Sequence, residues 1–188
     1  ERKVTISRAK MAIDFPASFM LVASMNPCPC GFYNHPEKKC SCPPGIVSKY
    51  LNRISGPLLD RIDLHVEVTP VAFHELSSQQ STEPSESIRN RVIKARAVQT
   101  ERFKNKAGLY ANAQMGASDL KKICQLNETS QQLLKQAMEK LGLSARAYDR
   151  ILKVARTIAD LAHSEEIGLE HLAEAIHYRS LDREGWAG

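Results

Sequence analysis

The sequence lacks any apolar run approaching the roughly 20 residues that a membrane-spanning helix needs. It opens Glu1-Arg2-Lys3-Val4, with neither an initiator Met nor a signal-peptide pattern, so we expect a segment of a longer cytoplasmic protein. It also lacks a Gly-x-x-x-x-Gly-Lys-Ser/Thr motif, the loop whose backbone amides hold nucleotide phosphates, and no strand ending in Asp-Glu precedes Asn26.

The composition is otherwise that of an ordinary globular protein. The 188 residues are 43% hydrophobic and 25% charged, enough for one or two small domains with their own cores. The formal net charge of +5 is compatible with nucleic acid as a partner but does not require it, because acidic and basic residues are interspersed.

Residues 1–76 predict an α/β region. Residues 3–13 alternate loosely around a basic patch, which indicates a short hairpin. The apolar run of residues 18–24 stops at a proline-rich loop and is typical of a buried strand in a mainly parallel sheet. A short helix over residues 46–51 and a further strand over residues 64–68 complete this part.

Residues 77–87 contain almost no apolar side chains, which predicts a linker and a domain boundary. Residues 88–188 then change to helical periodicity and predict a small all-helical bundle. The amphipathic stretches are Ile88 to Phe103, Ser118 to Ile123, Thr129 or Ser130 to Leu141, Ser144 to Leu161 and Leu169 to Tyr178.

Four of the five cysteines form two close pairs, Cys28-x-Cys30 and Cys40-x-Cys42, separated by nine residues. Four thiolates in such pairs can surround Zn²⁺ tetrahedrally, and a loop of this length can fold back to join them. His35 lies inside the loop as a possible substitute ligand. Reduced thiols or adventitious disulfides are the alternative.

Four strings, in order along nearly the whole chain, resemble the magnesium-chelatase-like AAA+ ATPases of the ComM/YifB family. The resemblance implies the C-terminal part of an α/β ATPase core followed by a helical lid, with the phosphate-binding half upstream. The strings are VASMNPCPCG (22–31, sensor 1 strand), ISGPLLDRID (54–63, arginine-finger segment), LSARAYDRILKVAR (143–156, sensor 2 helix) and YRSLDR (178–183, C-terminal signature).

The resemblance also implies roles for three residues at an ATP site. Asn26 would position the attacking water, Arg61 would act as an arginine finger in a neighbouring subunit, and Arg146 would report nucleotide state as sensor 2. Residue types alone leave other interpretations open: a turn-forming Asn26, an Arg61 paired with its flanking aspartates, and a solvated Arg146. Arg53 is the fallback for the finger.

The function implied by the resemblance is a ring-forming ATPase, expected to be hexameric, which uses ATP and Mg²⁺ to remodel DNA as a ComM-like branch-migration helicase. Arg8 and Lys10 of the hairpin are the expected contacts with DNA phosphates, although solvated hairpin charges would look the same. The alternatives are a magnesium chelatase ATPase subunit that acts on a protein or porphyrin partner, and a non-enzymatic, zinc-stiffened DNA-binding module.

The missing phosphate-binding loop generates a direct prediction. The 188-residue chain should neither bind ATP tightly nor hydrolyse it, because no backbone cradle for the phosphates is present. Isothermal titration calorimetry with ATP and Mg²⁺ measures this, and a micromolar dissociation constant would contradict it.

Overall fold

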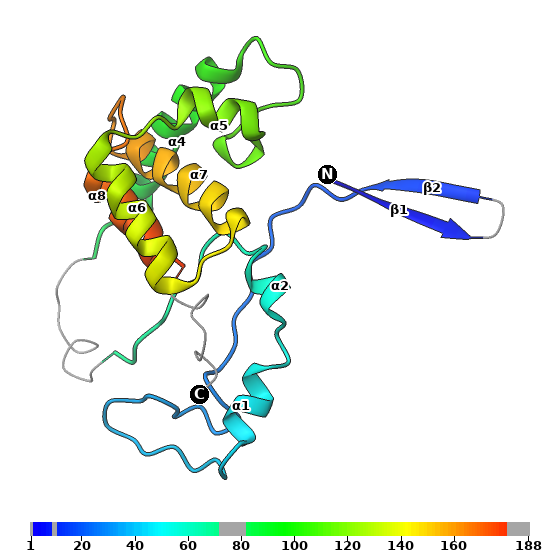
Figure 1. Ribbon diagram of the computed structural model, residues 1–188, viewed down its shortest axis with the longest axis vertical. Helices are drawn as coiled ribbons and strands as arrows, with labels where there is room; N and C mark the ends of the chain where they lie inside the picture. Colours follow the sequence, from blue (N-terminus) through cyan, green and yellow to red (C-terminus); the bar gives the residue numbers. More distant parts are fainter. Residues whose placement is uncertain (1, 9–10, 72–81, 180–188) are drawn as a thin grey trace.

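The computed structural model describes residues 2–8, 11–71 and 82–179, and it is mostly helical with one small sheet (Figure 1). Among the described residues, no helix is both long and apolar enough to cross a membrane. In chain order the elements are β1 (Lys3–Arg8), β2 (Met11–Pro16), α1 (Ile46–Leu51), α2 (Gly56–Leu59), α4 (Ser85–Phe103), the 3-10 turn η1 (Asn112–Gln114), α5 (Ala117–Ile123), α6 (Glu128–Leu141), α7 (Ala145–Leu161) and α8 (Leu169–His177).

The predicted hairpin is present, formed by the antiparallel strands β1 and β2. Asp14 accepts hydrogen bonds from the Lys3 ammonium at 2.7 Å and the Thr5 hydroxyl at 2.5 Å, which reinforces the pairing. The hairpin extends away from the helices in Figure 1, and apolar side chains such as Ile6 and Phe15 are about half exposed.

The predicted strands at residues 18–24 and 64–68 are not formed, and the predicted parallel sheet does not occur in the described part of the chain. Residues 18–24 follow an irregular path, and their large apolar side chains are exposed, Met20 by 87% and Val22 by 81%. A strand is stabilised by a hydrogen-bonded neighbour, and no described segment pairs with either run. Within the described residues up to 71, the α/β prediction for residues 1–76 therefore reduces to a hairpin and the two short helices α1 and α2.

The all-helical prediction for the second half agrees with the structure. Helices α5 to α8 and the end of α4 enclose one apolar core, whose fully buried members include Ile151 and Leu172. Ser144, the first residue of the predicted stretch, caps α7, because its hydroxyl accepts a hydrogen bond from the backbone N–H of Ala147 at 3.2 Å. Helix α6 ends at Gly142, whose φ of +61° suits glycine.

Helix boundaries differ from the predicted ones mainly at N-termini. Helix α6 begins one to two residues early because Asn127, not Thr129 or Ser130, caps it by accepting from the Ser130 N–H at 2.8 Å. Helix α4 begins at Ser85, so the last three residues of the predicted 77–87 linker are helical. Linker residues 77–81 lie outside the described ranges.

A buried carboxylate, that of Asp160 on α7, joins three elements of the helical region. Its two oxygens accept a bidentate pair of hydrogen bonds from Arg102 on α4, at 2.6 and 2.7 Å, and one from the Asn112 amide of η1 at 2.7 Å. Arg156 adds a fourth hydrogen bond at 3.1 Å. Burial alone would raise the pKa of Asp160, but hydrogen bonds from Arg102 and Asn112 and the charges of both arginines hold it below its ordinary 3.8.

Arg156 carries this network into the connection between α7 and α8. Its remaining guanidinium nitrogens donate to the backbone carbonyls of Glu165 at 2.6 Å and Ser164 at 2.5 Å. Helix α7 is thereby fixed to α4, to η1 and to the loop that leads into α8.

Replacing Asp160 by Asn should lower the free energy of unfolding by about 3–5 kcal/mol, because the guanidinium groups of Arg102 and Arg156 lose their buried counter-charge. Urea denaturation at pH 7 measures the change, with Asp149→Asn on the exposed face of α7 as the control. The folded pKa of Asp160 is depressed, so its stabilisation is complete above 3.8 and is lost as the pH falls through the folded value. Equal unfolding free energies for the two variants would contradict this account.

Candidate functional site

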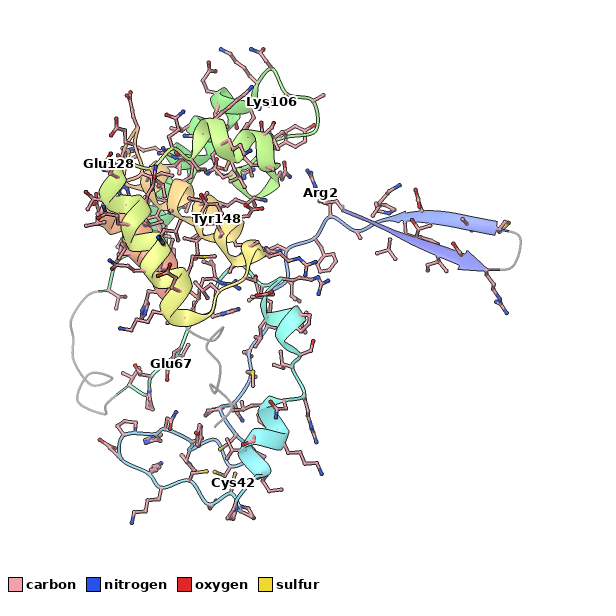
Figure 2. The ribbon with its side chains drawn as sticks, in the orientation of Figure 1. Arg2, Cys42, Glu67, Lys106, Glu128 and Tyr148 are labelled. Carbon is pink, nitrogen blue, oxygen red and sulfur yellow. The ribbon has the colours of Figure 1, made fainter. Side chains whose placement is uncertain are left out.

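The four clustered cysteines come together at one end of the molecule, in the loop before α1. Figure 2 places Cys42 beside α1. The sulfur atom of Cys28 lies 3.3 Å from that of Cys30 and 3.8 Å from that of Cys40, and Cys30 and Cys40 are 3.5 Å apart. All four sulfurs lie within 4.8 Å of one another. Tetrahedral Zn–S bonds of about 2.3 Å would separate the sulfurs by about 3.8 Å, so the cluster has the size of a zinc site.

The surroundings of the cluster favour the thiolate at Cys30 and the thiol at Cys42. The backbone N–H of Phe32 is the main cause that lowers the pKa of Cys30, to about 5. At Cys42 the backbone N–H of Cys30 acts in the same direction, but burial and the neighbouring thiols outweigh it and raise the pKa to about 12. A divalent cation would supply the positive charge needed to hold all four sulfurs as thiolates.

The suggestion of His35 as a substitute ligand does not agree with the structure. Its Nδ1 accepts hydrogen bonds from the backbone N–H groups of Glu37 and Lys38, each at 3.1 Å, and the metal-sized cluster consists of the four cysteines. Phe32 packs edge-on against the His35 ring at 5.6 Å, and the Lys38 ammonium lies 5.1 Å from the Phe32 ring centre. His35 therefore organises the loop tip.

Arg61 follows α2 in a tight turn and points its side chain to solvent. The turn is built by backbone hydrogen bonds, among them Arg61 N–H to Leu58 O at 3.0 Å. The Arg61 guanidinium is exposed and donates to the Pro57 carbonyl at 2.7 Å. The ion pairs formed by the flanking aspartates go elsewhere, Asp60 to Arg179 and Asp63 to Arg150. The local ion pair that residue types alone suggested for Arg61 is therefore not the one observed.

The segment around Arg61 is attached to the helical region by long-range contacts. Arg179, which follows α8 and is completely buried, donates from Nη1 to the Ile62 carbonyl and lies 4.0 Å from Asp60 through Nη2. Arg150 of α7 pairs with Asp63. The backbone N–H of the buried His65 donates to Tyr178 O at 2.8 Å.

Sequence reasoning did not identify Arg150, Arg179 or His65 as functional residues. The available signal was the position of Arg150 and Arg179 inside two of the family-like strings, where neither had a role. Their partners lie 87 and 117 residues away along the chain, a separation that no local pattern reports.

The other predicted site residues that the structure describes are exposed and dispersed. Asn26 lies in the irregular segment before the cysteine loop, and Arg146 lies in the first turn of α7. Across the described residues, no hydrogen bond or ion pair links either of them to Arg61. Arg53 follows α1 and is exposed, and Arg8 ends β1. Lys10 lies outside the described residues.

Comparison with known proteins gives two family matches that divide the chain. The family described as "Magnesium chelatase, subunit ChlI" matches residues 1–76, and "Magnesium chelatase, subunit ChlI C-terminal" matches residues 82–179. The matched ranges include both the cysteine cluster and the contacts between the Arg61 segment and the helices.

Relatives cover nearly all of this chain. Competence protein ComM of Haemophilus influenzae is 44% identical over 182 residues, 96% of this chain and 34% of the relative. Proteins named YifB from Salmonella typhimurium and Escherichia coli are 39% and 40% identical over 183 residues, 96% of this chain and 35% of each relative. The chain thus spans about a third of the length of these relatives. The match over more than half of its residues shows that the chain belongs to the magnesium chelatase subunit ChlI family, and within it the chain is similar to ComM and YifB.

Proposed function

We propose that the protein, at the length of its relatives, is a ring-forming AAA+ ATPase that couples ATP hydrolysis to DNA remodelling. The observation that carries the proposal is the presentation of Arg61. Its guanidinium is exposed while the two flanking acids are paired with arginines of the helical region. A planar guanidinium free of acidic partners suits contact with charge spread over phosphoryl oxygens of a neighbouring subunit.

The remaining roles follow from this assignment. ATP with Mg²⁺ binds between subunits, Asn26 orients the attacking water, and Arg146 couples nucleotide state to the helical region. The ring is a hexamer, and Arg8 and Lys10 of the projecting hairpin face DNA phosphates, which require only charge and reach. The exposed apolar run of residues 18–24 supports a larger assembly, because such a patch is normally covered.

The four-cysteine cluster is proposed as a structural zinc site. Cys28, Cys30, Cys40 and Cys42 supply the complete tetrahedral ligand set, and Cys28 is completely buried. Such a closed site would stiffen the loop and contribute to its folding, since structural zinc couples binding to folding. The turn at Gly31, where φ is +83°, brings the first cysteine pair into position.

A magnesium chelatase ATPase subunit is the second candidate, favoured by the descriptions of both matched families. It shares the ATP-dependent step with the first candidate but would transmit it to a protein or porphyrin partner. Its ATP turnover should therefore be indifferent to DNA.

The zinc proposal predicts one zinc ion per chain in the purified protein. Cys40→Ser should lose most of the metal after dialysis against a mild chelator, because three thiolates leave an open coordination position. Ser41→Ala, at the exposed residue between the second pair of cysteines, should retain it. Zinc content by mass spectrometry measures both, and a metal-free wild-type protein with a protease-resistant loop would refute the proposal.

The finger proposal predicts that Arg61→Ala lowers kcat for ATP hydrolysis by about 10³-fold or more at the relatives' full length, the range for arginine fingers in other NTPases. Arg53→Ala, at another exposed arginine, should change turnover little. The assay compares steady-state hydrolysis with no DNA, forked DNA and four-way DNA. Turnover that no DNA stimulates would favour the chelatase-like candidate, and unchanged turnover in Arg61→Ala would remove the assigned role.

A further inference from the structure

We propose that Arg150 and Arg179 are positioning residues through which the helical region sets the place of Arg61. The inference rests on the proposed role of Arg61 and adds the mechanism that moves it. In this account a displacement of α7 and α8 displaces the Arg61 backbone with them.

The residues that Arg179 and Arg150 contact lie on both sides of Arg61 in the sequence. Arg179 reaches Asp60 on one side and the carbonyl of Ile62 on the other. Arg150 reaches Asp63, one residue further along. The four consecutive residues from Asp60 to Asp63 thus include three that are held by the helical region and one, Arg61, whose side chain faces solvent.

His65 makes two further hydrogen bonds, one within the segment and one to the end of α8. The His65 N–H donates to Tyr178 O at 2.8 Å, and its ring Nε2 lies 3.3 Å from Leu59 O, at the end of α2. His65 is buried, so this joint is shielded from water. The Arg61 turn is therefore bound to the helical region both before and after the exposed guanidinium.

The contacts of Arg179 and Arg150 differ in how much they contribute to the stability of the fold. Arg179 is completely buried, so separating it from Ile62 O would remove a hydrogen bond from a buried charge and would be strongly unfavourable. The Asp63 side chain is 53% exposed, and an ion pair with so exposed a carboxylate contributes little to stability. Breaking the pair between Arg150 and Asp63 should therefore change the orientation of the segment with little loss of stability. For that reason these two residues are the better choice for a test.

The position of Arg150 on α7 also links it to Arg146, where a nucleotide-dependent shift of the helix would begin. Arg146, proposed to sense nucleotide, lies four residues before Arg150, so the two side chains project from the same face of the helix one turn apart. A shift of α7 produced by contacts at Arg146 would reach Asp63 through Arg150. Helix α7 is fixed at its other end by Asp160, so it moves as a unit with α4.

The test is a charge exchange in the protein at the relatives' full length. Arg150→Asp and Asp63→Arg should each lower kcat at saturating ATP by up to about 10²-fold, the cost of a misplaced catalytic group, while KM for ATP stays near the wild-type value. The double variant restores opposite charges and should recover most of the lost kcat. Lys135→Asp, on the exposed surface of α6, is the matched charge-reversal control.

Each outcome separates this inference from the proposed function. If Arg61→Ala abolishes turnover but Arg150→Asp leaves kcat unchanged, the positioning role is wrong and the finger role stands. A double variant that recovers no activity would also overturn the inference. If Arg61→Ala itself has no effect, the proposed function fails first.

Thermal unfolding midpoints show whether a variant has lost activity by losing structure. Should either reversed charge lower the midpoint, Asp63→Asn replaces it, since it removes only the charge of a half-exposed carboxylate. An unchanged kcat in that variant overturns the inference equally. Loss of kcat with an unchanged midpoint supports it.

Discussion

A completely buried guanidinium, that of Arg179, connects the two parts of this molecule. A buried positive charge needs hydrogen-bond acceptors, and one of those that it has is the backbone carbonyl of Ile62. Asp60 lies close enough to contribute its charge. The segment after α2 consequently cannot leave the helical region without exposing or stranding this charge, and the placement of Arg61 follows from that constraint.

The helical region can impose such a constraint because it is itself tied together by a second buried charge. Asp160 receives hydrogen bonds from α4, from η1 and from within α7, so these elements form one body around the apolar core. Arg150 projects from that body to Asp63. A buried carboxylate thus fixes the frame, and two arginines transmit its position to the exposed Arg61.

The sequence predicts the helical half well because its signals are local. Apolar spacing identifies α4 to α8 to within about three residues, and the Ser144 cap and the Gly142 stop follow from their own turns. Close cysteine pairs likewise predict a metal-sized cluster that the structure confirms.

The predictions that failed, and the contacts that were not predicted, depend on interactions between distant parts of the chain or on local hydrogen bonds of single side chains. The apolar runs at residues 18–24 and 64–68 have strand composition, yet a strand requires a hydrogen-bonding neighbour that the described chain does not provide. His35 is not part of the metal-sized cluster, and its Nδ1 accepts hydrogen bonds from two backbone amides of the loop. The contacts of Arg150 and Arg179 depend on how distant segments meet, so no periodicity or spacing could reveal them.

Amide hydrogen exchange of residues 58–65 in the wild type and in Arg179→Lys tests most directly whether the helical region holds the Arg61 segment. The account predicts that the wild-type His65 amide, bonded to Tyr178 O at 2.8 Å, is protected to a degree comparable with α7. In the variant that protection should fall while α7 keeps its own, because a lysine ammonium cannot reproduce the guanidinium contacts. A His65 amide that exchanges as fast as exposed residues 18–24 in the wild type, or is unaffected in the variant, would contradict the account.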